Sequence, residues 1–214
     1  MMIAHMKRMV DPFTKDRYWK DPRTGIDFRR IVGGFCWPFD TSPGAFCVLG
    51  EVRSVDQHTY THRVALLHDE EVNGVDELLR RVHSASVDTG VFDWIARRDV
   101  SEVRLVDQFN RLQSAQRQRQ LRLVHPQEGD DRDRFRFWIR LLERRTMDDK
   151  TMTFGESACV RDRLMALPPE AYAKEPEEFP AVAALLFALA EIDLRQTINI
   201  GEKLPSSVDT LAGY

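Results

Sequence analysis

The sequence has few cysteines and no long apolar run, and each shortage excludes a class of protein. Its three cysteines, Cys36, Cys47 and Cys159, show no C-x-x-C spacing and no paired Cys/His cluster. Neither a disulfide scaffold nor a structural zinc site is therefore expected. The longest apolar stretch, residues 181–190, is too short to cross a bilayer, and the first residues lack the apolar core of a signal peptide. We expect a cytoplasmic protein with no membrane partner.

Several motifs that identify enzyme classes are also missing. The sequence contains no G-x-x-x-x-G-K-[ST], no G-x-G-x-x-G and no G-x-S-x-G, which excludes P-loop ATPases, dinucleotide-binding folds and α/β-hydrolases of the usual form. Gly33-Gly34 instead predicts a bulge or a close backbone approach. His58, His62 and His68 lack the partners of a metal site, so they are interpreted as core or surface histidines.

The overall composition is that of a globular protein. Hydrophobic residues make up 43% and charged residues 30%, and the formal net charge is −3, so any nucleic-acid contact must be local. The basic residues are 25 arginines and 6 lysines. We predict one domain over residues 30–200, preceded by an aromatic N-terminal arm at 1–29 and followed by a tail at 201–214.

Hydrophobic periodicity predicts a mixture of strands and helices. Asn73 is expected to cap the first helix, and Val100–Val106 is interpreted as a buried strand that ends at Asp107. One continuous helix over 101–120 is the alternative, because its apolar residues also recur every third position. The other predicted strands cover 30–39, 45–52, 59–68 and 121–125, and the other helices cover 75–82, 108–120, 135–142, 155–167 and 181–195.

This order of elements is that of an RNase H-like fold, and over residues 30–195 the sequence resembles the nuclease domain of phage terminase large subunits. The resemblance rests on the opening hairpin, on Val106-Asp107 before a polar helix, and on the late segment EEFPAVAALLFALAEID. It implies an α/β fold with a mixed sheet, in which antiparallel opening strands precede parallel strands and helices cover both faces. Without a Walker motif, we expect the nuclease part alone.

The resemblance also implies a metal site. Such nucleases hold two divalent cations between carboxylates of the first strand, the end of the fourth strand and the start of the last helix, and the metals activate water. The candidates here are Asp40, Asp107 and Glu178, which would bind Mg²⁺ or Mn²⁺ and carry out catalysis. The ordinary alternatives are a helix cap for Asp107 and a dipole-complementing acid for Glu178.

A basic stretch offers a possible nucleic-acid face. Residues 104–145 contain 11 arginines, no lysine and 6 acidic residues. Arg117, Arg119 and Arg122 are the candidate phosphate contacts. The alternative is a solvated helix face with ion pairs to the neighbouring acids.

The expected ligands are only partly present, since Gly33–Cys36 carries no acid and Phe179-Pro180 stands where the family more often has His or Asp. We therefore predict a phage or prophage terminase nuclease-like domain that is catalytically degenerate, associated with DNA or the packaging machinery in the host cytoplasm. An active form would be a divalent-metal-dependent DNA endonuclease. The alternative is a non-enzymatic protein-interaction module that retains the fold and docks through its N-terminal arm.

Overall fold

The computed structural model describes most of the chain in several stretches. They are residues 5–38, 41–53, 63–97, 100–114, 119–126, 139, 142, 151–155, 158–167 and 178–203, with side chains beyond 192 left undescribed. The predicted helix at 135–142 therefore lies almost wholly outside the described residues. Its two described members, Ile139 and Leu142, are fully buried, as their apolar spacing predicts.

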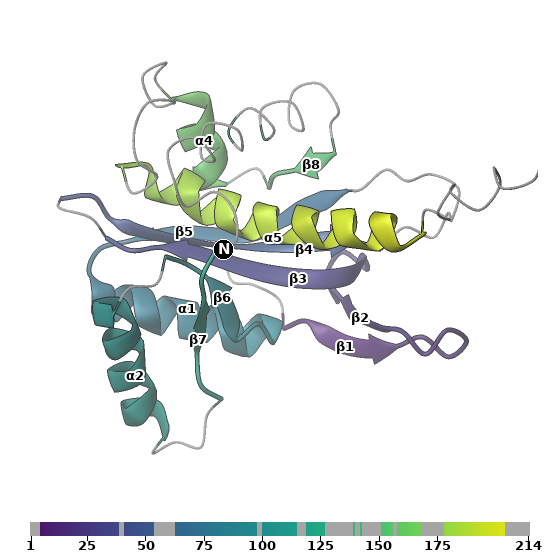
Figure 1. Cartoon of the computed structure of the whole chain (residues 1–214), viewed down its shortest axis with the longest axis horizontal. Helices are drawn as coiled ribbons and strands as arrows, with labels where there is room; N and C mark the ends of the chain where they lie inside the picture. Colours follow the sequence, from purple (N-terminus) through teal and green to yellow (C-terminus); the bar gives the residue numbers. More distant parts are fainter. Residues whose placement is uncertain are drawn as a thin grey trace, which may run out of the picture.

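Eight strands of the described chain form one mixed sheet (Figure 1). The antiparallel part runs in the order β1-β2-β3-β4-β5, and β8 then pairs with β5 in parallel. The bounds are β1 Lys7–Val10, β2 Arg17–Lys20, β3 Asp27–Cys36, β4 Gly44–Val52, β5 Val64–Val72 and β8 Met152–Thr153. The predicted opening meander is confirmed, although its third strand begins and ends later than predicted.

Two short strands extend the sheet from the other edge of β3. β6 (Asp93–Ile95) pairs in parallel with β3 at Gly33 and Gly34, and β7 (Arg122–Val124) pairs in parallel with β6. β2 uses the same edge of β3 nearer its start, at Phe28 and Asp27. The mixed sheet with antiparallel and then parallel strands is confirmed.

Helices cover both faces of the sheet, as expected (Figure 1). α1 (Val75–Thr89) and α2 (Val100–Ser114) lie on one face, and α4 (Cys159–Met165) and α5 (Pro180–Lys203) lie on the other. The alternating residues of β3 divide accordingly: Val32 packs in the core under α5, whereas Ile31 packs in the core over α1. The sheet thus separates two hydrophobic cores.

The predicted strand at 100–106 is wrong, because α2 is helical from Val100 to Ser114. The alternative of one helix in this region is closer to the structure. Val103, Leu105 and Val106 fit both periodicities over so short a window. Val106 and Asn110, four residues apart, are buried whereas Leu105 is exposed, and this is the spacing of a helix. The parallel strand that precedes α2 is instead β6, a three-residue strand that is not among the predicted elements.

The last helix is apolar on nearly all sides because it is buried on nearly all sides. Every residue from Ala181 to Ala190 is buried, and the alanines let the helix approach the sheet closely. No helix among the described residues combines the length and hydrophobicity needed to span a bilayer.

The N-terminal cap of the first helix differs from the prediction. The sequence predicts Asn73 as the cap of α1, but the cap residue is Gly74 with φ 82°, and no side chain caps the helix. At the other end Gly90 adopts the left-handed conformation, φ 76°, and its N–H donates to Ser86 O. Leu78, Leu79 and Val82 face the core as predicted.

The N-terminal residues show a pattern that periodicity does not reveal, since β1 and β2 are short strands. Two turns of the same sequence form connect β1 to β2 and β2 to β3: Asp11-Pro-Phe-Thr-Lys15 and Asp21-Pro-Arg-Thr-Gly25. In each, the Asp side chain accepts a backbone N–H two residues on, and the fifth residue has positive φ. The predicted boundary between arm and domain at residue 29 stays a prediction.

Candidate functional site at the start of the last helix

A cavity of about 280 Å³ opens where α4, α5 and the end of β5 meet. Its walls are mostly apolar, and its charged groups come from three elements: Glu71 of β5, Arg163 of α4 and Glu178 just before α5. The cavity therefore lies at the N-terminal end of α5, the place where the terminase resemblance expects an acid.

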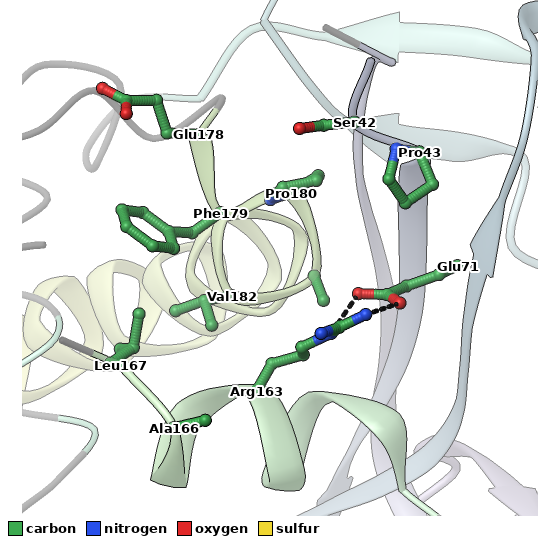
Figure 2. Close-up of a pocket in the computed structure, with 11 residues that line it drawn as sticks. Ser42, Pro43, Glu71, Arg163, Ala166, Leu167, Glu178, Phe179, Pro180 and Val182 are labelled. Atoms are coloured by element: carbon green, nitrogen blue, oxygen red, sulfur yellow. Dashed lines mark hydrogen bonds and ion pairs between the residues drawn. The ribbon is translucent and has the colours of Figure 1, made fainter.

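Glu71 and Arg163 form a bidentate ion pair across the cavity. The Arg163 Nε donates to Glu71 Oε1 at 2.8 Å and Nη2 donates to Oε2 at 2.7 Å (Figure 2). Both carboxylate oxygens of Glu71 are thus engaged by a cation. In Figure 2 the Glu178 carboxylate points away from this pair, so the two acids do not converge on one point.

Asp69, on the same face of β5, has a structural role. Its Oδ2 accepts the backbone N–H of Val160 at 2.7 Å, at the start of α4. Its carboxylate also lies beside two thiols: burial, and to a lesser degree the negative charge of Asp69, raise the pKa of Cys47, while burial and a hydrogen bond to Asp69 raise the pKa of Cys159. Both cysteines are free thiols in their neutral form, so neither is an activated nucleophile.

The side chains that β3 presents to α5 include no acid. In order along the strand they are Arg30, Val32, Gly34 and Cys36. Arg30 donates from Nη2 to Ile192 O at 3.0 Å, so this basic side chain holds the middle of α5 against the sheet. The only acidic residue of β3 is Asp27, its first residue, whose carboxylate lies 3.9 Å from Lys20 Nζ.

Gly34 leaves no room for a side chain at the centre of this face. A Cβ added at Gly34 would lie 2.2 Å from Ala184 O and 2.9 Å from Ala188 N. On the opposite face, a Cβ at Gly33 would lie 2.6 Å from the indole ring of Trp94. Because these two positions carry no side chain, the backbone of α5 approaches β3 closely on one face and Trp94 does so on the other. This confirms the predicted close backbone approach.

The predicted metal ligands occupy separate places. Asp107 is an exposed residue within α2, on the α1 side of the sheet, whereas Glu178 precedes α5 on the other side. The sheet lies between them, so the structure does not bring Asp107 and Glu178 together. Asp40 lies outside the described residues. Among the residues the structure describes, no three acids, histidines or cysteines are grouped as a metal would require.

The placement of Asp107 at a strand end is also wrong. The strand that pairs in parallel with β3 is β6, the fourth strand when β3 is counted as the first. Ala96 and Arg97 follow it. Three residues are too few to show a strand period. The presence of a tryptophan in this short segment is the feature that could have indicated a core strand. Trp94 is fully buried over Gly33, and its indole N–H donates to Ser86 Oγ at 2.8 Å.

Two of the three candidate phosphate-binding arginines are described, and both are engaged within the chain. Arg122 Nη2 donates to Asp93 Oδ2 at 2.8 Å, which lowers the pKa of Asp93. The Arg119 guanidinium lies over the Phe92 ring at 4.8 Å. Arg117 lies outside the described residues. DNA contact by this group stays a prediction.

Of the three histidines considered in the sequence, only His68 is among the described residues, and it packs against the core. His68 lies beside Phe46, 5.4 Å between ring centroids, and burial lowers its pKa. His58 and His62 lie outside the described residues.

Comparison with known proteins identifies the fold. No protein-family model matches the chain, and no curated protein matches its sequence. Among solved structures, the nuclease domain of the large terminase g2p from bacteriophage SPP1, determined with bound Mn, is similar with 16% sequence identity, a TM-score of 0.50, and coverage of 78% of this chain and 88% of that chain. The large terminase nuclease from thermophilic phage G20c, with bound zinc, gives 14% identity, a TM-score of 0.50, and coverage of 89% and 94%.

The chain has the fold of a large-terminase nuclease domain. This RNase H-like fold matches the resemblance drawn from the sequence. In its frame β3 is the first core strand, β6 the fourth and α5 the closing helix. The positions at which the resemblance expects acids on β3 and after β6 are occupied by Gly34 and its neighbours and by Ala96 and Arg97.

Proposed function

We propose that this chain is a catalytically degenerate relative of the terminase nuclease, which associates with DNA without cutting it by a two-metal mechanism. The observation that carries the proposal is the face of β3 beneath α5. Its side chains are Arg30, Val32, Gly34 and Cys36, so the strand supplies no carboxylate to a site at the start of that helix.

The close packing of α5 supports the same proposal. Two-metal hydrolysis requires several carboxylates that converge within coordination distance. At Gly34 the helix backbone fills the volume that a carboxylate would need. Glu71, which lines the cavity together with Glu178, is neutralised by Arg163. Of the predicted ligands that the structure describes, Asp107 belongs to α2 and Glu178 lies just before α5, and these two helices lie on opposite sides of the sheet.

The proposal predicts that the protein does not nick supercoiled plasmid with Mn²⁺ or Mg²⁺, while it still shifts a labelled duplex in a binding assay. An active metal-dependent nuclease run in parallel verifies the assay. Mn²⁺ titration followed by electron paramagnetic resonance gives an independent measurement, since a degenerate site leaves the ion in its free form.

Nicking by the wild-type protein that is abolished in Glu178→Gln or Asp40→Asn, with an unchanged melting temperature, would refute the degenerate proposal. The Asp107→Asn variant is the matched control. Because Asp107 is exposed on α2 and lies across the sheet, we expect this substitution to leave any activity and the stability unchanged.

A role in DNA packaging, in the host cytoplasm and with other packaging proteins, is part of this proposal. The terminase-like fold supports it. Co-purification of the tagged protein with a terminase subunit from phage-infected cells would test it, and recovery of DNA alone would limit the role to DNA association.

A further inference from the structure

The β1–β2 hairpin and the strand start that follows it form a strongly basic part of the described surface. Residues 5–30 contain eight basic and four acidic residues, in a chain whose net charge is −3. The segment also holds half of the chain's six lysines. Seven of the basic side chains belong to exposed residues: Lys7, Arg8, Lys15, Arg17, Lys20, Arg23 and Arg29.

Two of the four acidic residues of this segment, Asp11 and Asp21, are engaged by hydrogen bonds or an ion pair. The Asp11 carboxylate accepts the N–H groups of Phe13 and Thr14 and pairs with Arg53 at 2.6 Å. Asp21 is buried and accepts from Arg23 N and the Thr24 hydroxyl. These two acids build the turns, so the charge that the hairpin presents to solvent is mainly positive.

The strand register adds an unfavourable pair. Lys7 stands directly opposite Lys20 in the antiparallel β1–β2 ladder. Like charges at opposed positions destabilise a sheet. The Asp27 carboxylate lies 3.9 Å from Lys20 Nζ and offsets this repulsion only in part. An anion bound over the ladder would remove the repulsion.

An aromatic side chain stands at the tip of the hairpin. Phe13 is 91% exposed, in the turn position that Arg23 occupies in the second, equivalent turn. The turn is closed by the two bonds to Asp11 Oδ1, by Lys15 N to Asp11 O at 3.0 Å and by Asp11 N to Asp16 O at 2.8 Å. The ring is therefore held out in solvent by an ordered turn, and ordering on binding would cost little.

We propose that the β1–β2 hairpin is a DNA-binding ribbon, in which Lys7, Lys15, Arg17 and Lys20 contact phosphates and Phe13 stacks on a base. A two-stranded ribbon fits the major groove of B-DNA, and an exposed aromatic can stack on any base or wedge between base steps. The hairpin extends from the sheet away from α4 and the start of α5 (Figure 1). This inference rests on the DNA association proposed above and names its surface.

The charge distribution favours DNA over a protein partner. A protein interface concentrates apolar groups at its centre and depletes lysine. In residues 5–30 the four large exposed apolar side chains, Met9, Val10, Phe13 and Ile26, are interspersed with seven exposed lysines and arginines. Of these basic residues, Lys7 and Arg17 form no ion pair within the described part of the chain. Positive charge on one protruding element of an acidic protein is the arrangement expected for local phosphate contact.

The test compares two doubly substituted full-length proteins by fluorescence anisotropy with a labelled duplex over a range of salt concentrations. Lys7→Gln/Arg17→Gln removes two charges from the hairpin, and Arg104→Gln/Arg111→Gln removes two from exposed positions on α2. We expect the hairpin variant to bind about tenfold or more weakly at low salt, with the salt slope reduced by about 1.8 for two lost phosphate contacts. The α2 variant should bind as the wild type does.

Phe13→Ala tests the stacking contact, with Leu112→Ala, at a 70% exposed position on α2, as its control. On a duplex that contains an unpaired segment, Phe13→Ala should weaken binding about fivefold or more, and Leu112→Ala should not. Melting temperatures near that of the wild type show that each variant is folded.

Binding that survives the hairpin substitutions would overturn this inference alone, and loss in the α2 variant would place the contact on the arginine stretch instead. A wild-type protein that binds neither probe would overturn both this inference and the proposed DNA association. The exposed hairpin would then belong to a protein interface.

Discussion

The backbones of Gly34 and Ala184 are in direct contact: a Cβ added at Gly34 would lie 2.2 Å from the Ala184 carbonyl oxygen. This contact sets the distance between β3 and α5, the two elements that frame the candidate site. Because both partners are backbone, neither can move aside as a flexible side chain would.

Gly34→Ala should therefore lower the free energy of unfolding by about 3 kcal/mol, since overpacking a rigid contact forces the helix away from the sheet. Gly155→Ala is the control, because a Cβ at Gly155 would meet no atom within 4 Å and its φ is not positive; it should change stability by about 0.5 kcal/mol or less. Urea denaturation measures both. Equal stabilities would mean that α5 is not packed on β3 in this way.

The two equivalent turns allow a reciprocal test of backbone conformation. Lys15 has φ 63° and Gly25 has φ 71°, so one turn places a strained residue where the other places glycine. Lys15→Gly should stabilise the protein by about 1 kcal/mol, and Gly25→Ala should destabilise it by a similar amount. A Lys15→Gly variant that is less stable than the wild type would contradict the assigned conformation.

Asn110 joins α2 to the segment before β7. Its Nδ2 donates to Leu121 O at 2.8 Å and its Oδ1 accepts from Leu121 N at 3.0 Å, and the residue is buried. Asn110→Ala leaves both backbone groups without this partner, so we expect a loss of about 2 to 3 kcal/mol. Gln108→Ala, at an exposed position on the same helix, should be nearly neutral. Chemical denaturation of the two variants decides the matter.

The Asp11–Arg53 pair predicts a dependence of stability on pH. Hydrogen bonds, first to Arg53 and then to the turn N–H groups, lower the pKa of Asp11 from 3.8 to about 2. The unfolded chain therefore binds this proton more readily, and the stabilisation is complete above pH 3.8 and is lost as the pH falls through 2. Asp11→Asn should be less stable than the wild type near neutrality, and the difference should shrink across that window. A constant difference would assign the effect to the turn alone.

The fold is largely predictable from the sequence because its long elements bury one face each. The stripes of α1 and the apolar run of α5 have one reasonable interpretation, and the opening strands are bounded by turn residues. β6 escapes prediction because its three residues show no period, and its partner Gly33 is distant in sequence. The error at Asp107 follows from this omission, because without β6 the next apolar residues, 100–106, are assigned to the strand.

The candidate site is harder to predict than the fold. Which acids converge depends on which face of the sheet each element covers, and the sequence contains no local signal for that choice. The absence of an acid at Gly33–Cys36 is visible in the sequence, but its cause is not. Only the structure shows that Gly34 admits the backbone of α5, because Ala184 contacts it from a position 150 residues later in the chain.

The place of β1 in the sheet gives its positive charge another consequence. β1 is the outermost strand on its side, so within the described chain one row of its backbone groups has no neighbouring strand. An open edge invites pairing with the same edge of a second molecule, which leads to aggregation. Where Lys7 and Arg8 of one molecule lie opposite the same two residues of a second, their like charges disfavour such a pairing. The positive charges proposed to contact phosphates therefore also disfavour aggregation through this open edge.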